Sequence, residues 1–126
     1  LPAHPESMLH DLTDSKGRVT GSKKLASAYE QGDVLATKIV ERAAELLGVA
    51  IANQVTMLSL DQVIIGGGVT EALGERFLGL IRESFDASVF PKSLRDCELV
   101  ITQLEADAGV LGAAVLARNA REACCA

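Results

Sequence analysis

A short run of β-branched residues that ends abruptly in three glycines constrains the fold of this chain most strongly. The run is Val63-Ile64-Ile65, and Gly66-Gly67-Gly68 follows it directly. An apolar run closed by glycine is typical of a buried strand in a parallel sheet. After Thr70 the apolar residues recur at the helical period, which predicts a helix over residues 71–87. Strand, glycine turn and helix together indicate an α/β chain.

A second strand is predicted at residues 98–102, and the helix between the two strands makes them parallel, joined by a right-handed βαβ unit. Three more helices are predicted at residues 23–31, at residues 34–58 and from Asp107 to about Ala120. Two strands are too few for a sheet that helices cover on both faces. Either residues 1–20 contain strands that their pattern does not reveal or, as we expect, further strands come from a part of the protein outside this sequence.

The helix ends carry recognisable signals. Ser22 is the candidate N-cap of the helix at residues 23–31, which Gly32 should end in a left-handed conformation. Asp33 is the candidate N-cap of the helix at residues 34–58. The buried stripe predicted for that longer helix consists of Leu35, Ile39, Ala43, Leu46, Leu47, Ala50, Ile51 and Leu58. The face predicted for the helix at residues 71–87 consists of Leu73, Phe77, Leu80, Ile81 and Phe85.

Composition excludes several classes of function. The net charge is −5, from 12 basic and 17 acidic residues, which argues against a nucleic-acid partner. There is no apolar run long enough for a membrane helix, and residues 1–20 lack the pattern of a signal peptide. We expect residues 1–20 to be an irregular segment, residues 21–126 to form the domain, and the location to be cytoplasmic. The first residue is not Met, so we expect the chain to be cut from something longer.

Metal and disulfide chemistry are not expected of this chain. Its three cysteines are Cys97, Cys124 and Cys125, and its two histidines are His4 and His10. These spacings match neither a disulfide framework nor a zinc site. Cys97 is predicted to be a small core or edge residue, and a reducing compartment follows. No Ser/His/Asp arrangement or pair of carboxylates suggests a catalytic residue.

The triglycine turn is the one local feature with a binding mechanism. Ligands of open α/β sheets bind beyond the carboxyl ends of the strands, and glycines there let a ligand approach the backbone. The helix that follows adds free N–H groups and a partial positive charge. The alternative is a tight turn that only lets strand and helix pack. The spacing alone leaves both interpretations open.

Two common nucleotide motifs do not fit the turn. The dinucleotide fingerprint G-x-G-x-x-G requires a final glycine where Glu71 stands. A P-loop requires Gly-Lys-Ser/Thr where Val69 and Thr70 stand.

The last helix contains two small residues, Gly109 and Gly112, which predict close packing against a sheet or another helix. Asp107 is best interpreted as the N-cap of that helix.

Four segments resemble the C-terminal part of the ROK family, which contains bacterial sugar kinases and sugar-responsive repressors. The likeness covers about residues 21–118, and its specificity lies in the order and spacing of the segments. They are Ala28-Tyr29-Glu30-Gln31-Gly32-Asp33, then Leu47-Gly48 with Ile51-Ala52-Asn53, then Val63-Ile64-Ile65-Gly66-Gly67-Gly68-Val69, then Asp107-Ala108-Gly109-Val110-Leu111-Gly112-Ala113-Ala114.

The resemblance implies part of an actin-like, ribonuclease-H-like ATPase lobe, with a nucleotide cleft between two lobes in the intact protein. It implies that the glycine turn contacts the adenosine of ATP. By position this assigns Gly66, Gly67, Gly68, Val69 and Thr70 as nucleotide-binding residues. ATP with Mg²⁺ is implied for the intact protein, together with a sugar substrate bound by other regions.

The sequence also departs from the family's pattern. It lacks the Asp-x-Gly-Gly-Thr phosphate segment, the catalytic aspartate in its Asn-Asp context, the sugar-binding Glu-x-x-Gly-His stretch and the cysteine-rich zinc motif. We therefore expect no catalytic residue and no zinc site here, and an inactive chain on its own. The expected partner is a second copy in a homodimer, or the missing N-terminal lobe. The alternatives are a sugar-sensing repressor core and, more weakly, a dinucleotide-binding βαβ unit.

Overall fold

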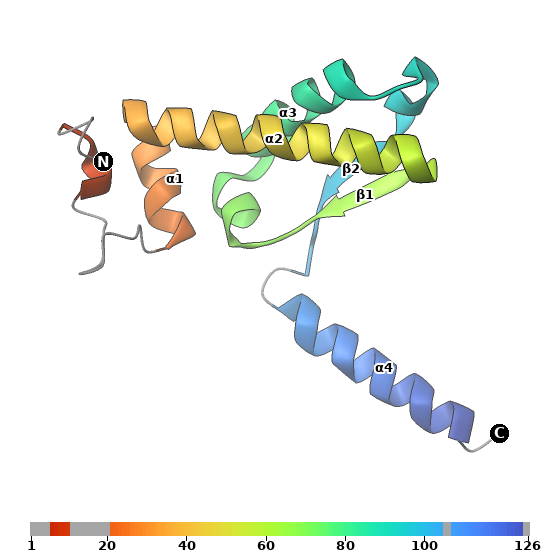
Figure 1. Cartoon of the computed structure of the whole chain (residues 1–126). Helices are drawn as coiled ribbons and strands as arrows, with labels where there is room; N and C mark the ends of the chain where they lie inside the picture. The colour runs from red at the N-terminus through yellow and green to blue at the C-terminus, as the bar shows by residue number, and fades with distance from the viewer. Residues whose placement is uncertain (1–5, 11–20, 105–106, 125–126) are drawn as a thin grey trace.

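The computed structural model describes residues 6–10, 21–104 and 107–124, and within them it has the expected α/β organisation (Figure 1). The elements run in the order that the sequence predicts. They are η1 (Met8–His10), α1 (Ser22–Glu30), α2 (Val34–Leu58), β1 (Gln62–Ile65), α3 (Gly68–Ser88), η2 (Lys92–Asp96), β2 (Glu98–Ile101) and α4 (Ala108–Cys124), where η marks a 3₁₀-helix.

The two strands pair in parallel, as predicted, in register from Gln62 opposite Glu98 to Ile65 opposite Ile101. Ile65 and Leu99 are buried in one core with residues of α2 and α3. The other face of β1 is open, since Ile64 is 64% exposed. The expectation of a buried strand is therefore wrong for this face, because no described element covers it, whereas parallel sheets are normally covered on both sides.

The ends of α1 and the start of α2 confirm two predictions and correct one. Asp33 caps α2 as predicted, since its Oδ1 accepts a hydrogen bond from the Ala36 N–H at 2.8 Å. Gly32 has the predicted left-handed conformation, with φ 77°. Ser22 is not a cap: it is the first residue of α1, because Gly21 takes the N-cap position with φ 91° and α1 has no side-chain cap. A serine would be strained at that φ, whereas glycine adopts it readily, and so the N-cap residue is Gly21.

The buried face of α2 is not the predicted one. Its buried residues are Ala36, Val40, Ala44, Gly48, Ile51, Ala52 and Val55. Of the predicted stripe only Ile51 is buried, whereas Leu46 is 54% and Leu58 61% exposed. The reason is the close approach of α3: a Cβ at Gly48 would lie 2.6 Å from the Ile81 carbonyl oxygen and 2.6 Å from Ser84 Cβ. The small residues Ala44, Gly48 and Ala52 permit this close approach. Ile39, Leu46 and Met57 lie on a second, exposed apolar stripe outside it.

Helix α3 buries the predicted face. Leu73, Phe77, Ile81 and Phe85 are buried, and Leu80 packs against this core while partly exposed. The helix begins at Gly68, three residues before the predicted start. It is kinked at Gly74, whose φ of 57° and ψ of −144° are not helical.

The short helix η1 is tied to the start of α2. Asp33 accepts hydrogen bonds from the Met8 N–H at 2.7 Å and from the Ser7 hydroxyl at 3.0 Å. Leu9 is fully buried in a small cluster with Ala28 and Ala36. A short helical turn thus lies within the segment at residues 1–20 that we expected to be irregular, and most of that segment lies outside the described residues.

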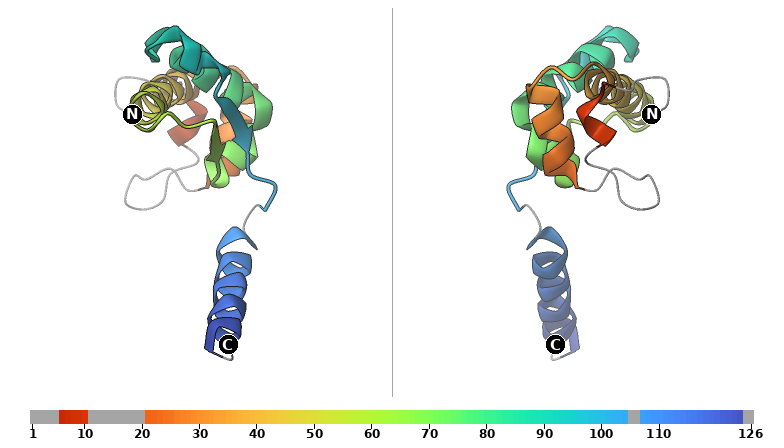
Figure 2. Two further views of the ribbon diagram at one scale, coloured as in Figure 1. Left: turned by 90° about the vertical axis from the view of Figure 1, so that its right-hand side faces the viewer. Right: turned by 90° about the vertical axis from the view of Figure 1, so that its left-hand side faces the viewer.

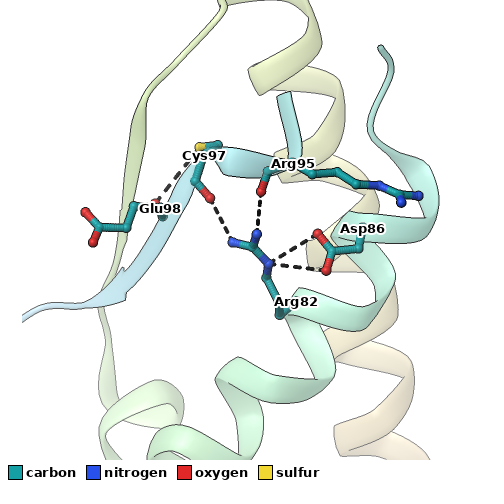
Figure 3. A network of polar contacts seen from close by, with 5 residues as sticks. All are labelled: Arg82, Asp86, Arg95, Cys97 and Glu98. Carbon is teal, nitrogen blue, oxygen red and sulfur yellow. Dashed lines mark hydrogen bonds and ion pairs between the residues drawn. The ribbon is translucent and has the colours of Figure 1, made fainter. Parts of the chain in front are cut away.

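Arg82 fixes the entry into β2 (Figure 3). From α3 it donates hydrogen bonds to the carbonyl oxygens of Arg95 and, at 2.7 Å, of Cys97, and it forms an ion pair with Asp86. Arg95 belongs to the 3₁₀-helix η2, which directly precedes β2. Cys97 is buried, as predicted, and this burial raises the pKa of its thiol. Cys97 thus packs as a small residue of the core.

Helix α4 lies apart from the other elements in all three views (Figures 1 and 2). It continues to Cys124, beyond the predicted end. Val110 and Leu116 are each 71% exposed, and a Cβ at Gly109 or Gly112 would meet nothing within 4 Å. The predicted close packing of these glycines is therefore wrong within the described residues, because no element there offers α4 a surface.

Candidate functional site

The glycine turn lies where the carboxyl end of β1 meets the start of α3 (Figure 1). Two other elements reach the same place. Thr102 follows β2 and lies against Gly66, while Ser22 at the start of α1 lies against Gly68. One side chain thus flanks the turn on each side, and the sequence patterns identified neither of them as part of the site.

Gly67 presents open backbone to solvent. Its φ of 121° and ψ of 158° belong to a region that essentially only glycine adopts. A Cβ there would meet nothing within 4 Å, and Gly67 holds the N-cap position of α3 without any side-chain cap. A ligand could therefore approach the backbone at this point as the binding interpretation requires.

Gly66 and Gly68 are explained by packing. A Cβ at Gly66 would lie 2.9 Å from Thr102 Cγ2, and a Cβ at Gly68 would lie 3.1 Å from Ser22 Oγ. Neither glycine has a left-handed φ. Neighbouring side chains thus limit a Cβ at the two outer glycines, whereas at Gly67 only the backbone conformation does. The binding interpretation remains a prediction for the whole turn.

Val69 and Thr70, the last two predicted binding residues, differ in their exposure to solvent. The Val69 side chain is 40% exposed, whereas Thr70 is buried, with 5% exposure, so its side chain faces away from solvent. The Glu71 N–H bonds to the Gly67 carbonyl oxygen at 3.0 Å. The amides of Gly68, Val69 and Thr70 precede this bond, and the first amides of a helix have no partner within the helix. Any contact from Thr70 would therefore come from its backbone.

A groove borders the turn and shares Thr102 with it. Gly74, Glu75 and Leu78 of α3 line one side, and residues 99–103 line the other. The kink at Gly74 lies at this groove. The sequence pattern did not predict this kink, because the apolar residues keep the helical period on both sides of Gly74.

Other reactive groups do not gather at the turn. No group of three or more His, Cys, Asp or Glu side chains that could hold a metal occurs among residues 6–10, 21–104 and 107–124. Asp107, expected as a cap near this sheet edge, directly precedes α4 and is exposed, and its role as a cap remains a prediction. Within the same residues, no helix is both long and apolar enough to cross a bilayer.

Comparisons with known proteins agree on one family. The model of the ROK family matches residues 6–120. The chain is 36% identical over 116 residues to a glucokinase of Halalkalibacterium halodurans, covering 92% of this chain and 34% of that protein. It is 34% identical over 92 residues to an N-acetylmannosamine kinase of Haemophilus influenzae, covering 73% of this chain and 29% of that protein.

A solved structure shares the fold. It is a protein of Cytophaga hutchinsonii assigned as a sugar kinase, with a TM-score of 0.72 and 26% identity over 90% of this chain and 36% of that one. The chain spans about a third of the length of the curated relatives it matches. The family match covers nearly the whole chain, including the glycine turn, and so this chain belongs to the ROK family.

Proposed function

We propose that this chain is the adenosine-binding part of an ATP-dependent sugar kinase. The relatives reported above are named as kinases of glucose or N-acetylmannosamine, which supports a sugar kinase for the intact protein. The sheet that lacks strands, with one open face, fits part of an actin-like lobe better than a complete domain.

The glycine turn at residues 66–70 is the proposed contact with ATP. The observation that carries this proposal is the exposed backbone at Gly67, which lies at the carboxyl end of a parallel strand with its Cβ position free. This is the place where open α/β sheets bind ligands. Gly66, Gly68 and Val69 would shape and flank the contact, and Thr70 would offer only its amide.

The phosphoryl transfer itself would depend on the preceding part of the protein. The described residues have no cluster of carboxylates suited to Mg²⁺, which prefers oxygen ligands, so we assign no magnesium ligand to this chain. Nor does the turn hold a side chain able to deprotonate a sugar hydroxyl. The chain alone should therefore be inactive, while the intact protein should phosphorylate glucose or an N-acetylated amino sugar with ATP.

The two other interpretations make different predictions. A sugar-sensing repressor core would share this fold, but the relatives reported above are named as enzymes. A dinucleotide-binding unit would bind NAD in preference to ATP, and Glu71 stands where its fingerprint needs a third glycine.

A thermal-unfolding titration of this chain with ATP, ADP and NAD tests the proposal. A ligand that binds only the folded state stabilises it by RT ln(1 + [L]/Kd), about 2.7 kcal/mol at a hundredfold excess over Kd. We expect ATP and ADP to raise the unfolding temperature and NAD to have no effect. The control is Gly67→Val, which should abolish the shift because valine cannot adopt this backbone conformation.

A shift with NAD alone would contradict the kinase proposal, and a shift that survives in the Gly67→Val variant would remove the turn from the site. No shift with any nucleotide would show that the turn is not sufficient for binding. In the intact protein, the same substitution should impair ATP-dependent phosphorylation of glucose or N-acetylmannosamine.

We also propose that the chain works in association, with the preceding lobe or as a homodimer, in the cytoplasm. Large apolar side chains are exposed on three elements, at Leu46 and Met57 of α2, Ile64 of β1 and Leu116 of α4. Sedimentation of the chain would distinguish a dimer from a monomer that needs its lobe.

A further inference from the structure

Two side chains from outside the glycine turn occupy the space that Cβ atoms within it would need. Thr102 fills the place next to Gly66, and Ser22 fills the place next to Gly68. We propose that Thr102 and Ser22 are positioning residues that set the shape of the turn and so hold the exposed backbone at Gly67 in the conformation that a nucleotide would contact. The ligand in this inference rests on the proposed function, whereas its geometry does not.

Thr102 is held in place by two hydrogen bonds. Its N–H donates to the Ile65 carbonyl oxygen at 2.9 Å, which continues the parallel register past Ile65 and Ile101 and sets Thr102 beside Gly66. Its hydroxyl accepts from the Leu104 N–H at 3.2 Å. The hydroxyl is thus engaged on the far side, and the methyl group is directed at Gly66. A β-branched side chain has few rotamers, so this methyl cannot easily move away.

A larger residue at position 66 is therefore opposed by a neighbouring side chain, whereas a larger residue at position 67 is opposed by the backbone conformation. Gly66 has no left-handed φ, so alanine there would be limited only by the Thr102 methyl, 2.9 Å from the Cβ position. Gly67 has free space around it, but its φ of 121° strains any L-residue. A smaller side chain at residue 102 should relieve the first substitution and leave the second unchanged.

Gly68 gives an independent second case. Its Cβ position lies 3.1 Å from Ser22 Oγ and 3.7 Å from Ser22 Cβ. Replacing Ser22 with alanine removes the nearer atom and leaves an ordinary van der Waals contact. Gly68→Ala should therefore have a smaller effect than Gly66→Ala, and Ser22→Ala should relieve it.

The test is a double-mutant cycle on the chain, with ATP affinity and unfolding temperature both measured. The variants are Gly66→Ala, Thr102→Ser and the two together. Thr102→Ser removes the methyl group and keeps the hydroxyl that binds the Leu104 N–H. We expect Gly66→Ala to weaken ATP binding about tenfold and to lower the unfolding temperature by about 4 °C. The double variant should recover both.

Gly67→Ala, alone and with Thr102→Ser, is the matched control, and Thr102→Ser should restore neither its affinity nor its unfolding temperature. The inference is wrong if the double variant at residues 66 and 102 binds ATP no better than Gly66→Ala, or if Thr102→Ser rescues Gly67→Ala equally well.

Two outcomes need a second measurement. If Gly66→Ala fails to fold, the double-mutant cycle is repeated with the milder substitutions Gly68→Ala and Ser22→Ala. Recovery of ATP affinity and of unfolding temperature in that double variant would support the inference, and its absence would contradict it. If the parent chain binds no ATP, the proposed nucleotide contact fails for this chain. The recovery of unfolding temperature then still decides whether Thr102 sets the turn, so the two failures are distinguishable.

Discussion

Helices α2 and α4 are both apolar and both contain glycine, yet they behave in opposite ways. In α2, Gly48 lies so close to α3 that a Cβ would meet the Ile81 carbonyl oxygen at 2.6 Å. In α4, Gly109 and Gly112 would meet nothing within 4 Å. Small residues at helical spacing thus permit close packing, and whether packing occurs depends on the partner surface. For α4 that surface is not among the described residues.

Among the substitutions that test this contrast between α2 and α4, we expect the largest effect at Gly48. Gly48→Ala should destabilise the chain by about 1–3 kcal/mol, because the added methyl overpacks the contact with the α3 backbone. Gly112→Ala is the matched control on α4, where alanine only improves helix propensity, by about 1 kcal/mol or less. Urea unfolding followed by circular dichroism measures both. Equal effects of the two substitutions would contradict the contrast between the helices.

The N-terminal cap of α2 at Asp33 should make the stability of the folded chain depend on pH. The hydrogen bond from the Ala36 N–H is the largest cause that lowers the pKa of Asp33 below its usual value of 3.8. Burial opposes it, and the bonds from Met8 and Ser7 add smaller effects that lower the pKa further. A carboxyl group with a lowered pKa stabilises the folded state above its unfolded pKa. That contribution is lost as the pH falls through the folded pKa, that is, below about pH 4.

Asp33→Asn separates the charge from the cap, because asparagine also caps helices but does not titrate. We expect the unfolding temperature of the parent chain to fall more steeply between pH 5 and pH 2 than that of the variant, with the two differing most near neutral pH. Parallel pH profiles for the two proteins would show that Asp33 is not coupled to folding.

The order of elements, the parallel strands and the Asp33 cap could be predicted because local signals determine them. Gly32 needs a left-handed φ, and β-branched residues followed by glycine indicate a strand end. The buried side of α2 could not be predicted, since Leu46 and Val40 are equally apolar and only the approach of α3 selects between them. At the turn, the sequence predicted nucleotide contacts at residues 66–70, which remain a prediction, and it gave no sign of Thr102 and Ser22, which come close only through strand register and helix packing.

The second apolar stripe of α2 should resemble α4 rather than the inner face of its own helix. Leu46 is 54% exposed, whereas Val40 on the inner face is 1% exposed. Leu46→Gln should therefore change the stability of the chain by less than about 0.5 kcal/mol, as surface substitutions usually do. In the intact protein the same substitution should be costly if a preceding lobe covers this stripe. Urea unfolding of both forms measures the difference: a large loss in the chain alone would mean that the stripe is already buried, and equal small effects in both would mean that α2 keeps this face in water. The size of the difference therefore reports how much of α2's outer surface the rest of the protein covers, which neither helix pattern nor composition can reveal.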